Sequence, residues 1–109
     1  MFYKNMSLDF SLLKVQPSEV FSVNYTHNVS EMWDLAGIYD DLYNSDGKLA
    51  KDIVGNLIFG LKKMLDNPDK FKKLNPENGW GDYDGAVKVL NEIISACNEY
   101  PDAEISISK

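Results

Sequence analysis

Residues 20–39 read VFSVNYTHNVSEMWDLAGIY, and the spacing of the apolar residues changes in the middle of this stretch. Phe21, Val23 and Tyr25 alternate with other residues, which predicts a strand with one buried face. The apolar residues that follow recur three or four positions apart, which predicts a helix that ends near Gly37. A strand that passes directly into a helix indicates an α+β fold.

The junction between the two carries a signal for a helix start. Asn28 is a favoured N-cap residue, and Glu31 follows it at the spacing of a capping box. We therefore expect Asn28 to cap the helix that begins after it.

The pattern continues in both directions from this stretch. Residues 7–15 alternate and predict a first strand, which Gln16-Pro17-Ser18 interrupts before the second. Residues 104–108 alternate again and predict a closing strand, for which either edge of the sheet would serve. Helical spacing predicts a long helix over about residues 48–66, a short segment that starts at Asn67-Pro68, and a last helix over about residues 82–99.

The expected architecture is a single α+β domain spanning residues 1–109. A small antiparallel sheet, made of two N-terminal strands plus a C-terminal strand, packs against three to four helices. Within the long helix, Gly55 and Gly60 each cost about 1 kcal/mol relative to alanine, so we expect another element to pack closely against them. We also expect Ile58 and Leu65 to widen the buried stripe of this helix.

Composition excludes several classes of function. The net charge is −6 and the chain contains no arginine, so direct nucleic-acid binding is not expected. The single cysteine excludes an internal disulfide and a cysteine-based metal cluster. Membrane insertion is not expected, because no apolar run approaches the roughly 20 residues that span a bilayer. Polar residues interrupt the N-terminus, so we expect no signal peptide and a cytoplasmic location.

No catalytic residue, metal site or cofactor site is predicted. His27, the only histidine, lies at the expected helix start, where it could contact an anion; a junction residue hydrogen-bonded to the backbone is the favoured interpretation. Cys97 lies on the apolar stripe near the end of the last helix, a position that predicts core packing rather than a reactive thiolate.

Residues 75–83, NPENGWGDY, form the other informative stretch. Gly79 and Gly81 permit backbone angles that are closed to other residues, and Pro76 fixes its own. The stretch therefore predicts a loop of defined shape that holds Trp80 in one place. Two interpretations stay open: Trp80 folds back over the core as a plug beneath Tyr83, which is favoured, or it is exposed as a binding residue.

Three groups of residues resemble a family of small uncharacterised proteins encoded by phages, prophages and bacteria, and the likeness covers about residues 23–108. The first group is Asn24-Tyr25-Thr26-His27-Asn28 with Met32 and Ala36-Gly37-Ile38-Tyr39; the second is Asn75-Pro76-Glu77-Asn78-Gly79-Trp80-Gly81 with Tyr83; the third is Ala96-Cys97 with Tyr100-Pro101-Asp102-Ala103. Residues 40–51 depart from the family, which carries an aromatic-proline segment there. The resemblance implies a phage or mobile-element context and pairs the first two groups, but it implies no activity.

The resulting hypothesis is a non-enzymatic, macromolecule-binding protein of the bacterial cytoplasm with a protein partner. One version is an inhibitor of a host defence or nucleic-acid-processing complex, similar to an anti-CRISPR protein. The alternative is a small-ligand or enzymatic domain whose pocket lies between the two paired segments. The candidate binding residues in both cases are Thr26, His27, Asn28, Asn78, Gly79, Trp80 and Tyr83. A structural subunit of a symmetric oligomer is a third hypothesis, and the sequence does not give the oligomeric state.

Overall fold

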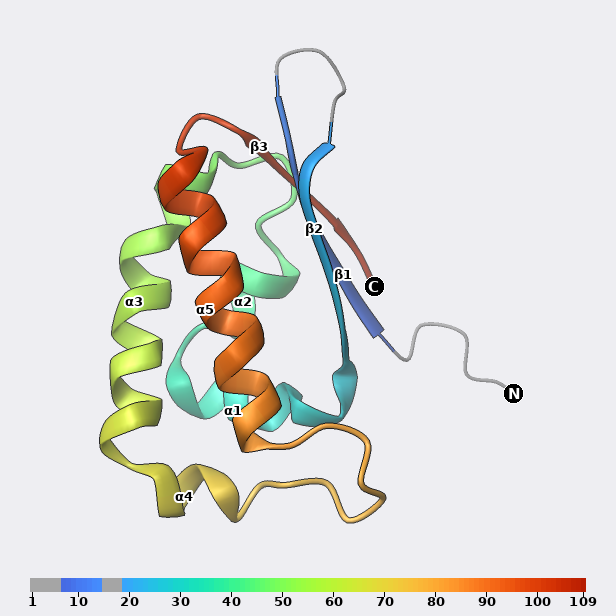
Figure 1. Cartoon of the computed structure of the whole chain (residues 1–109), viewed down its shortest axis with the longest axis vertical. Helices are drawn as coiled ribbons and strands as arrows, with labels where there is room; N and C mark the ends of the chain where they lie inside the picture. The colour runs from blue at the N-terminus through green and yellow to red at the C-terminus, as the bar shows by residue number, and fades with distance from the viewer. Residues whose placement is uncertain (1–6, 15–18) are drawn as a thin grey trace.

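A three-stranded antiparallel sheet lies beside a group of helices in the computed structural model, which describes residues 7–14 and 19–109 (Figure 1). The central strand is β1 (Ser7–Leu13), with β2 (Glu19–Thr26) on one side and β3 (Glu104–Ser108) on the other. The predicted α+β fold is confirmed, and the closing strand pairs with β1. The break expected at residues 16–18 falls outside the described residues.

The strand register explains why one face of the sheet is buried. Opposite each other on β1 and β2 lie Leu8 and Tyr25, Phe10 and Val23, and Leu12 and Phe21. Because side chains alternate across a strand, these pairs share one face, and that face meets the helices. The other face carries polar side chains, among which Asn24 donates a hydrogen bond to Asp9 at 2.7 Å. The alternation predicted for both N-terminal strands is confirmed.

The described residues contain five α-helices where three to four were expected. They are α1 (Ser30–Ala36), α2 (Tyr39–Tyr43), α3 (Ala50–Asp66), α4 (Pro68–Lys72) and α5 (Tyr83–Glu99). Gly37 ends α1 with a φ of 80°, as its position predicted. The additional helix is α2, which occupies part of the stretch expected to be a loop. It forms because Ile38 and Leu42, four positions apart, are both fully buried.

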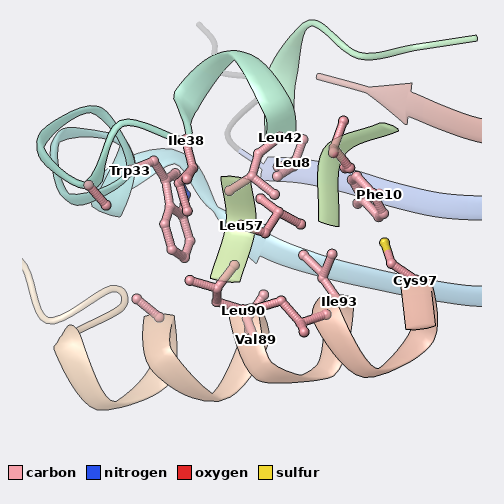
Figure 2. Packing of buried hydrophobic residues seen from close by; sticks show 14 of the residues in the cluster. Leu8, Phe10, Trp33, Ile38, Leu42, Leu57, Val89, Leu90, Ile93 and Cys97 are labelled. Atoms are coloured by element: carbon pink, nitrogen blue, oxygen red, sulfur yellow. The ribbon is translucent and has the colours of Figure 1, made fainter. Parts of the chain in front are cut away.

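The hydrophobic core lies where the sheet, α3 and α5 meet (Figure 2). Leu57 of α3 lies among side chains from the sheet, from the α1–α2 region and from α5. The labelled neighbours in Figure 2 are Leu8, Phe10, Trp33, Ile38, Leu42, Val89, Leu90, Ile93 and Cys97. Among the helices described, none is long and apolar enough to cross a membrane.

The two glycines of α3 have opposite surroundings. Gly60 is buried, and a Cβ added there would lie 2.5 Å from Ile38 Cγ2 and 3.3 Å from the carbonyl oxygen of Ala36. Gly55 is exposed and has open space around it. The close packing predicted from these glycines is therefore confirmed for Gly60 and wrong for Gly55.

The outer face of α3 is more apolar than a solvent-facing helix requires. Ile58 and Leu65 are 48% and 53% exposed, so the prediction that they widen the buried stripe is wrong. Ile58 and Leu65 lie outside the core because they are not on the helical face that carries the buried residues Ile53, Leu57 and Met64.

Substituting the two glycines separates packing from helix propensity. We expect Gly60→Ala to destabilise the protein by about 1–3 kcal/mol, because the added methyl group overpacks a closed contact. Gly55→Ala should stabilise it by about 0.4–1 kcal/mol, because it gains propensity without a clash. Urea unfolding of the two variants measures both effects, and equal stabilisation by both would contradict the packing described at Gly60.

Candidate functional site

The junction between β2 and the helices is capped by a different residue from the one predicted. Thr26 Oγ1 accepts a hydrogen bond from the Asn28 backbone N–H at 3.2 Å, so Thr26 caps a 3₁₀ turn, η1 (His27–Val29). Because this turn precedes α1, Val29 occupies the N-cap position of that helix and no side chain caps it. The prediction that Asn28 is the N-cap is wrong. Its side chain reaches Asn78 instead, with Nδ2 3.5 Å from Oδ1.

Internal hydrogen bonds give the 75–83 loop a defined shape. Asn75 Oδ1 accepts a bond from the Tyr83 N–H at 2.8 Å, which ties the start of the loop to its end. Asn78 Oδ1 accepts one from the Trp80 N–H at 2.9 Å, an Asx turn that sets the chain direction at the tryptophan. Gly79 supplies the left-handed conformation that this turn needs, with a φ of 76°.

The 75–83 loop packs against the end of β2. Gly81 has a φ of 91°, and a Cβ there would lie 2.5 Å from Thr26 Cγ2. One residue further on, the Asp82 N–H donates to the Tyr25 hydroxyl at 3.2 Å. A Cβ at Gly85 would in turn lie 2.1 Å from that hydroxyl. The two sequence-paired segments therefore converge, through contacts that only glycine permits.

Trp80 lies on the surface and Tyr83 in the interior. The Trp80 side chain belongs to a residue that is 70% exposed, whereas Tyr83 is 7% exposed and its hydroxyl donates to the Met64 carbonyl at 2.8 Å. The favoured interpretation of Trp80 as a plug over the core is therefore wrong, because the residue is mostly exposed. Tyr83, predicted as a binding residue, anchors the loop from below.

His27 turns toward α2. Its Nδ1 lies 2.8 Å from the Tyr43 hydroxyl, and the two rings stack with centroids 5.2 Å apart. Tyr39 also stacks with Tyr43, and the centroids of their rings are 4.4 Å apart. Burial and the nearby Tyr39 raise the pKa of the Tyr43 hydroxyl to about 12, so it stays protonated at neutral pH. These partners of His27 were not predicted from the sequence, although the spacing of the two tyrosines by four residues could have indicated a helical pair.

The convergence of the two segments is packed rather than hollow at Gly81, where the neighbouring Thr26 and Val29 leave no room for a methyl group. A shallow hollow lies nearby, lined by Ser30, Glu31, Asp34 and Tyr39. The exposed members of the candidate set are Asn78, Gly79 and Trp80, while Thr26, His27 and Asn28 are half-buried. The arrangement thus presents a surface residue on a fixed support.

The metal-binding and thiol chemistry of the described residues is limited. In residues 7–14 and 19–109, no group of three or more histidine, cysteine or acidic side chains could hold a metal ion. Cys97 is fully buried, and burial raises the pKa of its thiol to about 11. Its sulfur points toward Phe10 in Figure 2, which confirms the prediction of core packing.

Comparisons with known proteins add no family to this geometry. No protein-family model matches the chain, and no match is found among curated proteins or solved structures. The resemblance to phage-encoded proteins stays a prediction. Function is therefore inferred from the geometry of the chain itself.

The contact between Gly81 and Thr26 can be tested by relieving it. We expect Gly79→Ala to cost about 1–2 kcal/mol through backbone strain alone, because nothing lies within 4 Å of the added Cβ. Gly81→Ala should cost at least about 1 kcal/mol more, because strain and overpacking combine. Thr26→Ser keeps the capping oxygen and removes Cγ2, so it should recover part of that extra loss in the double variant. Urea unfolding of Gly79→Ala, Gly81→Ala, Thr26→Ser and Gly81→Ala/Thr26→Ser gives four changes in the free energy of unfolding relative to wild type. If Gly81→Ala costs as much in the Thr26→Ser background as in the wild type, the contact between Gly81 and Thr26 is contradicted.

The burial of Cys97 predicts a protected thiol. In the native protein at neutral pH, we expect a soluble disulfide reagent to react at least about a hundredfold more slowly than in urea, because both access and thiolate fraction are reduced. The measurement is the absorbance of the released thiolate. Native reaction as fast as that of the unfolded chain would reopen the nucleophile hypothesis.

Proposed function

We propose that this protein is a non-enzymatic protein-binding domain whose anchor is Trp80. The observation that carries the proposal is the contrast between an exposed indole and the closed set of contacts that hold its backbone. Trp33, the other tryptophan, is 1% exposed, so burial of a large aromatic is available to this fold and is not used at position 80.

The energetics of association favour such a residue. Tryptophan is enriched among the few interface residues that contribute most of the binding free energy. Ordering a loop on binding has an entropic cost, and a loop that is already held by Asn75, Asn78 and Gly81 avoids most of it. An exposed indole on a preorganised loop therefore combines a large contact area with a small ordering cost.

The charges around the loop indicate the chemistry of the partner. Glu77, Asp82 and Asp84 flank Trp80 in sequence, and the whole chain has a net charge of −6. A partner with an apolar pocket rimmed by basic side chains would be complementary. In its narrower version, which rests on the resemblance to phage-encoded proteins, the partner is a nucleic-acid-processing complex of the bacterial host, and this acidic protein occupies its basic groove as an anti-CRISPR protein would.

The alternative of a small-ligand or enzymatic site between the same segments has weaker support. The convergence of Asn28 with Asn78 is what that alternative requires. The same contact is accounted for by fixation of the loop, and the packing at Gly81 fills the space between the segments.

Removing the indole should abolish binding and leave the fold intact. We expect Trp80→Ala to change the free energy of unfolding by less than about 0.5 kcal/mol, because the side chain is exposed. The matched control is Phe59→Ala, which removes another exposed aromatic, 74% exposed on α3, without touching the loop.

The measurement is a comparative pull-down from bacterial host lysate with the wild-type protein and both variants, followed by titration of any recovered partner. We expect the wild-type protein and Phe59→Ala to recover the same partner. Trp80→Ala should bind that partner more weakly, with a loss of at least about 2 kcal/mol of binding free energy. Recovery of no partner, or equal retention by Trp80→Ala, would count against it.

A further inference from the structure

The rest of the chain covers the two edges of the sheet to different extents. The outer edge of β3 is covered by the connection between α2 and α3, which runs beside it in Figure 1. The Gly47 N–H donates to the Ile105 carbonyl at 2.8 Å, and the Ile105 N–H donates to the Lys48 carbonyl at 2.7 Å. The Ile107 N–H donates to Asp46 Oδ1 at 2.7 Å. This edge is therefore closed to a further strand.

The edge formed by β2 has no such cover. Within the described residues, β2 pairs with β1 and makes no backbone–backbone hydrogen bond to a segment outside the sheet. Alternate N–H and C=O groups of an edge strand point away from its neighbour and can pair with another chain. β2 has eight residues, EVFSVNYT, and contains neither lysine nor proline, which commonly block such an edge. Glu19 and a β-bulge lie at its start, so the stretch from Phe21 on is the part that can pair with a further strand.

A groove runs beside the first part of this edge, between β2 and α5. Its apolar side chains are Val20 and Phe21 from β2 with Ala96 and Tyr100 from the end of α5. The register of β2 against β1 shifts at this point, after the pair Leu12–Phe21. Such a bulge re-aims side chains, which fits the presence of both Val20 and Phe21 in the groove.

Two carboxylates line the α5 side of the groove. Glu92 and Glu99 lie seven residues apart, so they share a helix face and are separated by about 10 Å along its axis. The ion pairs in the described part of the chain join Lys51 to Asp102 and Lys62 to Asp66, so neither Glu92 nor Glu99 belongs to one. A cation is already accommodated at one end, where Lys14 Nζ lies 5.8 Å from the centroid of the Tyr100 ring.

We propose that the β2 edge and this groove bind an extended peptide segment of a protein partner that carries apolar residues and lysine or arginine on the same face, at every second position. The peptide would add a strand to the sheet through backbone hydrogen bonds to β2. Its apolar side chains would enter the groove, and its cations would reach Glu92 and Glu99. The site is separate from Trp80 and goes beyond the function proposed above.

Charge distinguishes this occupant from a second copy of the chain. Pairing of two β2 edges would bring together two molecules that each carry a net charge of −6, and would leave both pairs of glutamates without a cation. A basic peptide compensates them, so the complementarity favours the peptide.

The probe is a synthetic lysine–valine peptide of the same length as β2, titrated into the whole ¹⁵N-labelled protein. Lysine and valine occupy every second position in turn, and threonine occupies the positions between, so that both lysines and valines face the groove. We expect chemical-shift changes in β2 and in the second half of α5, with none in β3. The same peptide with glutamate in place of lysine controls for charge. A peptide of the same composition whose lysines and valines fall on opposite faces of the strand controls for pattern. Equal binding of either control, or shifts confined to β3 or the 75–83 loop, would overturn the proposal.

Variants of the protein test the carboxylates. The double variant Glu92→Gln/Glu99→Gln should weaken binding of the lysine–valine peptide about tenfold. Asp69→Asn/Glu77→Gln makes the same change in net charge on α4 and the 75–83 loop and should leave the affinity unchanged. Equal weakening by both variants would reduce the interaction to net charge and overturn the proposed site.

Two further measurements separate this site from its alternatives. N-methylation of the peptide backbone along one edge should abolish binding, and methylation along the other edge should preserve it, because only one edge pairs with β2. Trp80→Ala should bind the peptide as the wild-type protein does. The proposal for the β2 edge and the proposal for Trp80 can therefore fail independently. Loss of peptide binding in Trp80→Ala would show that the peptide binds at the Trp80 loop. Dimerisation of the free protein through β2 would show that the edge binds a second copy of the chain. Either result would contradict the inference.

Discussion

The close contact between Gly81 and the end of β2 is the constraint on which the functional geometry depends. A backbone that touches Thr26 at this point must be glycine, both for its φ of 91° and for the missing Cβ. The contact places the 75–83 loop against a strand that is itself held in the sheet. We therefore expect the backbone of the loop to be about as rigid as that of the core. In this loop Tyr83 is buried and Trp80 is exposed.

The molecule separates its stabilising parts from its accessible ones. The core is formed by the inner face of the sheet with α3 and α5, and it contains Cys97 as an ordinary packed residue. The features open to partners lie on the rim: the Trp80 loop at one end of β2 and the groove with Glu92 and Glu99 at the other. Binding through either feature would require no opening of the core.

Local patterns predicted the elements well and their capping and exposure less well. The alternation of Phe10 with polar neighbours, the helical spacing of Leu57 and the position of Gly37 all depend on nearby residues, and the structure confirms them. Asn28 failed as a cap because a 3₁₀ turn capped by Thr26 intervenes, and capping patterns alone do not distinguish the two. The prediction of Trp80 as a plug was wrong because, of the two aromatic residues in this stretch, Tyr83 is buried and Trp80 is exposed, which local sequence patterns do not determine. The pairing of the His27 segment with the Trp80 segment was predicted, but the partner of His27, Tyr43, lay in a stretch expected to be a loop.

The central claim is that Trp80 is presented by a loop that is fixed before any partner arrives. Backbone ¹⁵N relaxation of the free protein tests this most directly, by comparing residues 78–81 with the middle of α3. The account predicts order parameters near those of the helix, about 0.85. Values below about 0.6 at Asn78 through Gly81, with a rigid α3 in the same sample, would show a flexible loop and contradict the account.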